Sequence, residues 1–252
     1  MSDRKVDEVN PHELDELNSA VIEWGFLWNK ETPHEEILSC IEKYKFGDFS
    51  TFTHINKKGN QKTEEYSRKA VLQKLKRHKN PHIFIQDGDS YETFSTLSST
   101  ERSSIIQLVS KRKYLKKSGV QVSQATNQAI SFVSELSSIL KNFNVASISG
   151  EFPSNLADFY NDNDIRWVPN CFDNFLTWMH FLHPSYYTKY LTREDILKMP
   201  AQEIQEWENG IIQVQMFDHP FNYDAPENRQ IIVEASEYLN ERHRVFRESQ
   251  KE

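Results

Sequence analysis

Several histidine and acidic side chains have spacings that could bind a metal ion, but each set is incomplete. His180 and His183 lie three residues apart on an expected helix, where both rings could face one side. No acidic third ligand follows at helical spacing, and Pro184 ends the helix directly after His183. Asp162 and Asp164 have the spacing of a calcium-loop start without its glycine or its bidentate glutamate. We therefore predict no metal site, and interpret these residues as packed or surface histidines and a plain turn.

The candidate nucleophiles and acids for catalysis are similarly isolated. Asp87 and Asp89 could hold a divalent ion for phosphodiester chemistry, but the strand expected next has Glu92 and no lysine, so we interpret them as turn residues. The chain has neither a Gly-x-Ser-x-Gly motif nor a P-loop. Cys40 and Cys171 lie 131 positions apart without a neighbouring base, and we expect two buried free thiols rather than a disulfide. The sequence thus predicts no catalytic residue and no cofactor.

Basic residues are concentrated in two segments, 68–79 and 111–117, which could neutralise the phosphates of a nucleic acid. Residues 57–117 include 15 basic and 6 acidic residues, whereas residues 151–252 include 9 basic and 18 acidic ones. The candidate polyanion contacts are Lys74, Lys76, Arg77, Lys111, Arg112 and Lys113. A net charge of −7 argues against nucleic acid as the main partner. The asymmetry also permits docking on a charged protein or on another copy, and solvated helix faces explain it without any partner.

A chain of 252 residues makes one large domain or two modest ones. Its 16 Phe, 10 Tyr and 5 Trp predict an aromatic-rich core, and only 7 glycines weigh against Rossmann, P-loop and barrel folds. The charged N-terminal segment does not have the pattern of a secretory signal. No apolar run reaches the roughly 18 residues that span a bilayer, so we expect a cytoplasmic protein without a membrane span. Because 147–168 is rich in turn residues, we divide the chain into 1–150 and 151–252.

Apolar residues recur at helical spacing along most of the chain. This pattern predicts helices over 10–28, 32–44, 63–77, 121–143, 172–182 and 227–246. One β-hairpin is expected at about 82–97, because Asp87-Gly88 separates two strand-like runs. Ser98–Glu101 has the pattern of a capping box and predicts a further helix that runs through Val109 into the basic run 111–117 and stops near Gly119. The expected fold class is mainly α with a small β-hairpin element (α+β), with a helical C-terminal region.

Residues 191–212, which we call the elbow, hold two helix starts close together. Thr192 can cap a short helix with Asp195 three positions on, and Pro200 can begin a second helix. We expect the apolar side of this pair to face outward and bind another polypeptide. Exposed aromatic residues are also expected just before the elbow. The candidate partner-binding residues are Ile196, Met199, Ile204, Trp207, Tyr186 and Tyr187.

The elbow resembles a C-terminal segment of bacteriophage tail assembly chaperones. The matching residues are the run 193–197, Met199-Pro200, Glu203 and Trp207, and the unit 83–109 is similar to the small β-plus-helix opening of such proteins. The overall style is similar to accessory baseplate-hub assembly factors of T-even-type contractile-tail phages, although the sharp match covers only about a tenth of the chain. The resemblance implies a non-catalytic factor that binds an aggregation-prone tail or hub component in the host cytoplasm.

Three functions remain as alternatives. The first is a non-catalytic assembly factor or chaperone that binds a phage tail or baseplate-hub protein during virion assembly, by docking a helix in a groove. The second is a nucleic-acid-binding protein that uses the basic segments 68–79 and 111–117. The third is an enzyme with a diffuse site around His180, His183 and Asp218. Toxin-related and other binding roles form the remaining class.

Overall fold

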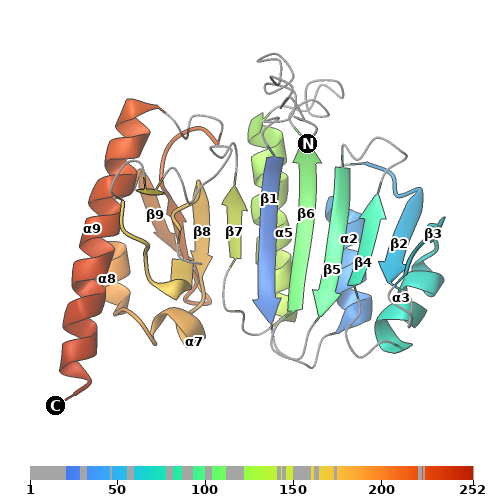
Figure 1. Cartoon of the computed structure of the whole chain (residues 1–252), viewed down its shortest axis with the longest axis horizontal. Coiled ribbons are helices and arrows are strands. Elements are labelled where there is room, and N and C mark those ends of the chain that lie inside the picture. The colour runs from blue at the N-terminus through green and yellow to red at the C-terminus, as the bar shows by residue number, and fades with distance from the viewer. Residues whose placement is uncertain are drawn as a thin grey trace, which may run out of the picture.

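The computed structural model contains one ten-stranded antiparallel β-sheet with helices packed against it (Figure 1). Its strands are β1 (Val21–Trp28), β2 (Thr51–Ile55), β3 (Gln61–Glu65), β4 (His82–Gln86), β5 (Thr93–Ser99), β6 (Ser104–Lys111), β7 (Ala146–Ser149), β8 (Met179–Leu182), β9 (Glu203–Glu206) and β10 (Ile212–Gln215). Their order across the sheet is β3-β2-β4-β5-β6-β1-β7-β8-β10-β9.

Six α-helices and one short 3-10 helix complete the part of the chain that the structure describes. They are α2 (His34–Tyr44), α3 (Arg68–Arg77), α5 (Val122–Ile139), η1 (Asn170–Phe172), α7 (Pro184–Tyr187), α8 (Arg193–Leu197) and α9 (Pro226–Ser249). The structure describes residues 21–28, 33–45, 47–55, 60–77, 82–86, 93–99, 104–111, 122–140, 143, 146–149, 160–161, 165–172, 175–220, 223 and 225–251.

The expectation of a mainly helical fold is wrong, because the protein has a mixed α+β fold. Strand β1 replaces the end of the helix expected over 10–28, and β6 replaces the helix expected after Ser98–Glu101. Strand β8 replaces the end of the helix expected over 172–182. These strands lie inside the sheet and consist of short, nearly continuous apolar runs, which periodicity alone does not distinguish from buried helix.

Other expected elements are confirmed. Helices α2, α5 and α9 lie where apolar residues recur at helical spacing and turn residues flank them. Strands β4 and β5 form the expected hairpin, in which His82 pairs with Ser98 and Gln86 with Phe94. The helix expected over 63–77 is confirmed only from Arg68, since β3 occupies Gln61–Glu65. The turn residues Asp87 and Asp89 lie outside the described residues.

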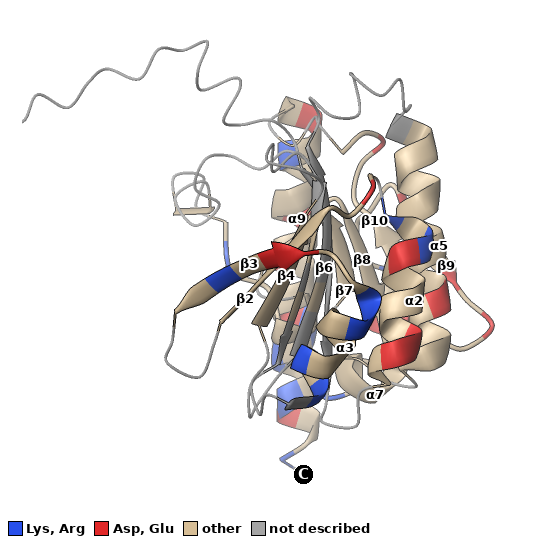
Figure 2. Cartoon of the chain, turned by 90° about the vertical axis from the view of Figure 1, so that its right-hand side faces the viewer, with Lys and Arg blue, Asp and Glu red and all other residues tan. Residues whose placement is uncertain are grey.

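Helices α2, α3 and α5 lie together on one side of the sheet (Figure 2). The strands beneath them present a row of buried apolar side chains: Phe52, Ile83, Ile85, Leu97 and Ile106. Helix α9 lies at the β9 end of the sheet, beside α8 (Figure 1), and buries Ile232, Ala235 and Leu239. Strand β7, just before residue 150, pairs with both β1 and β8, so the sheet continues across the proposed boundary between 1–150 and 151–252.

Candidate functional site

The first half of the elbow forms as the sequence predicts, and it is tied to helix α9. Thr192 and Asp195 form a capping box at the start of α8, with Asp195 N donating to Thr192 Oγ1 over 3.1 Å. Thr192 N and Oγ1 donate to Asp195 Oδ2, and Arg242 of α9 donates from Nε to Asp195 Oδ1 over 2.5 Å. Burial would raise the pKa of Asp195, but the hydrogen bonds from Thr192 and Arg242 outweigh it and hold the pKa below its ordinary value. A charged Asp195 therefore fixes α8 to α9.

The second half of the elbow is a strand rather than a helix. Residues from Glu203 to Glu206 form β9, which pairs with β10, so Pro200 precedes a sheet edge. Ile196 has an exposed fraction of 0% and Met199 of 4%, which corrects the expectation of an outward apolar side. Ile204 is half-buried. Ile196 and Met199 therefore belong to the core, whereas β9 is an exposed strand at the edge of the sheet.

The aromatic members of the predicted partner-binding set are also packed into the fold. Trp207 is half-buried, with its ring centroid 5.4 Å from that of Phe181 and its Nε1 donating to Gln213 Oε1 over 3.2 Å. Tyr187 is buried with an exposed fraction of 3%. Tyr186 is half-buried under the Lys189 ammonium, which lies 5.0 Å from its ring centroid. These three aromatic side chains therefore contribute to the packing of the protein itself.

Two of the predicted polyanion contacts are already compensated by carboxylates. Lys74 lies 3.4 Å from Glu64, and Lys76 lies 2.6 Å from Glu35. The side chains of Arg77 and Lys111 are not among those described, and Arg112 and Lys113 lie outside the described residues. The described part of the basic surface therefore offers less free positive charge than the sequence count indicates.

Glu64 forms the centre of a charged cluster where β2, β3 and α3 meet. His54 Nε2 lies 3.0 Å from Glu64 Oε1, and Lys62 Nζ lies 3.0 Å from the same oxygen. Hydrogen bonds from His54 and Lys62, together with Lys74, lower the pKa of Glu64 to about 2. The carboxylate is therefore an anchor that stays ionised at neutral pH, and not a proton donor.

The predicted histidine pair does not converge on a common site. His180 on β8 is fully buried, accepts a hydrogen bond at Nε2 from Thr177 N over 2.7 Å, and has a pKa lowered to about 3 by burial. His183 instead caps α7 by accepting from Ser185 N at Nδ1 over 3.2 Å. Asp218 is exposed. Within the described residues, no group of three or more His, Cys, Asp or Glu side chains could hold a metal ion.

Both cysteines are buried free thiols, as the sequence predicts. Burial raises the pKa of Cys40 and of Cys171 to about 12. A thiol becomes a useful nucleophile only as the thiolate, which such a pKa suppresses at neutral pH. The two residues therefore behave as small apolar side chains of the core.

Trp167 is the feature that the sequence analysis missed. Its exposed fraction of 52% is the highest among the large apolar side chains in the described part of the chain. Its ring centroid lies 5.0 Å from that of Phe175, which in turn lies 5.1 Å from that of the buried Tyr160. Trp167 is thus the solvent-facing end of an aromatic column that continues into the core.

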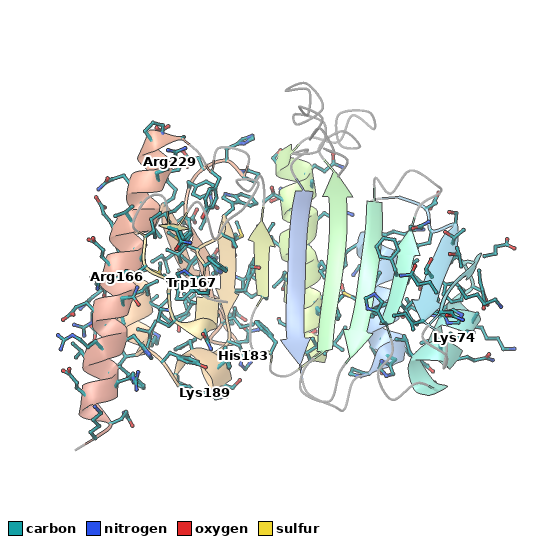
Figure 3. All side chains as sticks on the ribbon, in the orientation of Figure 1. Lys74, Arg166, Trp167, His183, Lys189 and Arg229 are labelled. Atoms are coloured by element: carbon teal, nitrogen blue, oxygen red, sulfur yellow. The ribbon has the colours of Figure 1, made fainter. Side chains whose placement is uncertain are left out.

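Hydrogen bonds and buried neighbours fix the backbone on both sides of this column. Tyr160 OH accepts from Leu176 N over 2.7 Å, and Tyr223 OH donates to Leu176 O over 2.9 Å. Ser236 of α9 donates to the carbonyl of Arg166. Figure 3 shows Arg166 and Trp167 on the half of the molecule that α9 borders. The indole is therefore presented on a fixed backbone.

The sequence holds only a weak signal for this site. Trp167 lies at the end of the break over 147–168, next to a charged residue and shortly before Pro169. Its exposure results from the burial of Ile165 and Val168 on either side, which turns Arg166 and Trp167 outward. Local spacing does not reveal that pattern, because it depends on which residues the tertiary fold buries.

Comparison of the chain with protein-family models, with curated proteins and with solved structures finds no match in any of the three. No helix among the described residues is long and apolar enough to cross a membrane.

Proposed function

We propose that this protein acts by binding another protein, without catalysis, and that Trp167 anchors the interface. The observation that carries the proposal is the half-exposed indole at the end of the Tyr160–Phe175–Trp167 column. Tryptophan and arginine are enriched among the residues that dominate binding energy at protein interfaces. An exposed tryptophan with Arg166 beside it therefore supports a protein-binding role more directly than the elbow does.

The rigid placement of Trp167 also supports a binding role. A side chain that is already ordered loses little conformational entropy when a partner covers it. Trp167 has only two side-chain torsions, its ring packs on Phe175, and Ser236 holds the preceding carbonyl. The patch is preorganised to contribute to affinity.

The finer proposal of a phage tail or baseplate-hub component as the partner, bound during virion assembly in the host cytoplasm, rests on the resemblance of the elbow alone. The residues that carry this resemblance include Met199, which is buried, and Trp207, which is half-buried. They stabilise the fold that presents Trp167, and they do not themselves offer an open apolar face. Partner identity and binding surface are thus separate proposals that can fail separately.

The test is co-expression of the full chain with tail and baseplate-hub proteins of a contractile-tail phage, followed by quantitative co-purification. We expect Trp167→Ala to reduce recovery of the bound protein by roughly tenfold, as loss of a hot-spot side chain does. Ile55→Ala is the matched control, because Ile55 is 39% exposed at the far end of the sheet. Equal recovery with both variants would refute the role of Trp167, and no recovery by the wild type would refute the phage partner.

A further inference from the structure

We propose that Arg166 and Trp167, which we call the Trp167 patch, bind an acidic segment of the partner protein. This inference rests on the proposed protein-binding function and names the chemistry that its surface recognises. The indole supplies the apolar contact, and the neighbouring guanidinium supplies a positive charge that can hold a carboxylate through two parallel hydrogen bonds.

Arg166 is exposed and forms no ion pair within the described residues. Three other arginines of residues 151–252 are compensated: Arg193 pairs with Glu206, and Arg242 with Asp195. Arg244 bridges Glu241 and Glu248 over 2.6 and 2.8 Å. The charge of Arg166 is therefore available to a ligand, whereas the charges of the other three are already paired with carboxylates.

This free cation lies in the acidic part of the chain, where residues 151–252 include 18 acidic and 9 basic residues. Several of those acidic side chains are paired, for example Glu194 with Lys198 over 2.6 Å. A long polyanion such as nucleic acid contacts an extended surface, and the excess of acidic residues in 151–252 disfavours it. A short acidic segment needs only the local patch, so an acidic polypeptide fits better than a nucleic acid.

The backbone holds the guanidinium of Arg166 and the indole of Trp167 next to each other at the surface. Arg166 and Trp167 are adjacent in sequence and both exposed, between the buried Ile165 and Val168. The Arg166 carbonyl accepts from Ser236 of α9, so the backbone that carries both side chains is fixed while the guanidinium remains available. A partner segment with a carboxylate next to an aromatic or aliphatic side chain would match both groups at once.

The experiment measures fluorescence anisotropy of three labelled probes with the full-length protein. The probes are a short peptide of Glu and Asp interleaved with Leu and Phe, the same peptide with Gln and Asn at the acidic positions, and a single-stranded oligonucleotide of equal charge. We expect the acidic peptide to bind most tightly, with affinity falling between ~50 mM and ~300 mM salt because the contact includes an exposed charge.

Charge reversal locates the site. Arg166→Glu should weaken binding of the acidic peptide by roughly tenfold or more, and Trp167→Phe should weaken it less. Lys189→Glu is the matched control, because it makes the same charge change at an exposed lysine outside the patch and should leave affinity unchanged. Circular dichroism and thermal unfolding of each variant verify that the fold is retained.

The outcomes separate this inference from the protein-binding role. Equal binding of the acidic and amide peptides, or tighter binding of the oligonucleotide, would overturn the acidic-segment proposal. Equal effects of Arg166→Glu and Lys189→Glu would also overturn it. If Trp167→Ala still reduces co-purification of the natural partner in those cases, protein binding stands and only the assigned partner chemistry fails.

Discussion

The two ends of the sheet are built differently just inside their exposed outermost strands, β3 and β9, and the difference explains where the sequence is easy to interpret. All four residues of β8 are buried, and so are Ile212, Gln213 and Val214 of β10. In β2, by contrast, the buried Phe52 and His54 alternate with half-buried threonines. A strand buried on both faces has a continuous apolar run, whereas a strand packed on one face has alternating residues. Strands β8 and β10 are therefore buried on both faces, whereas β2 is buried on one face only.

Each end also contains a buried histidine, and the two histidines have different hydrogen-bond partners. His180, in β8, is held by a backbone N–H of Thr177 and packs edge-on to Phe172, with ring centroids 5.1 Å apart. His54, in β2, lies against the carboxylate of Glu64 at the sheet edge. The doubly covered end keeps its histidine neutral, and the other end gives its histidine an ionic neighbour.

The largest expected effect comes from removing apolar volume at the doubly covered end. Phe181→Ala in β8 should lower the free energy of unfolding by about 3–5 kcal/mol, because it leaves a cavity beneath Trp207 that the sheet cannot close. Phe84→Ala in β4 is the matched change at a half-buried position and should cost about 1–2 kcal/mol. Urea unfolding monitored by circular dichroism measures both. Equal losses would show that the two ends are covered alike.

The same contrast shows how much of the fold could be predicted from sequence. The two strand-like runs on either side of the Asp87-Gly88 turn signal predict the hairpin, and apolar periodicity predicts α5 and α9. For strand β8 the sequence instead predicts a helix, because Leu176, Met179 and Leu182 also fit helical spacing. A continuous apolar run does not reveal which backbone pairs with which, since that pairing depends on strands far away in sequence.

In the candidate site, too, features that depend on neighbouring residues could be predicted and features that depend on the tertiary fold could not. The capping box of Thr192 and Asp195 depends on residues three positions apart, so it could be predicted and is confirmed. The burial of Met199 depends on the tertiary fold, which local sequence does not encode. The exposure of Trp167 likewise depends on which of its neighbours the tertiary fold buries. Local capping was predictable, whereas exposure was not.

The pH dependence of stability should reveal the neutral histidine of the doubly covered end. Burial lowers the pKa of His180 from 6.5 to about 3. Between those values the unfolded chain binds a proton at this residue and the folded chain does not, so stability falls as pH falls below about 6.5. By pH ~4.5 the expected loss from this residue is about 2–3 kcal/mol.

Urea unfolding at pH values from ~7 to ~4.5 measures this loss, since folding stability is linked to proton uptake. His180→Gln should show a shallower dependence, because the amide does not ionise in this range. His183→Asn is the control, since asparagine retains a cap on α7. If the wild type and His180→Gln have parallel pH profiles, the buried ring is not the source of the dependence.

The smallest expected effect tests the charged contacts of Glu64 at the β2 end of the sheet. Hydrogen bonds from His54 and Lys62, with Lys74, lower the pKa of Glu64 from 4.5 to about 2. The lowered pKa means that this stabilisation is complete above pH ~4.5 and is lost as pH falls towards ~2. Glu64→Gln should therefore cost about 1 kcal/mol at neutral pH, because Glu64 is partly exposed and solvent weakens its charged contacts.

The control for this charge is on the same strand. Glu65→Gln changes an exposed neighbour of Glu64 and should leave unfolding nearly unchanged. Parallel urea titrations at pH ~7 and pH ~2.5 should show a difference between Glu64→Gln and wild type that is several times smaller at the lower pH, since most of the stabilisation is lost as pH approaches the lowered pKa. A difference of equal size at low pH would mean that the glutamine disturbs packing around His54 and that charge is not what joins β3 to β2 and α3.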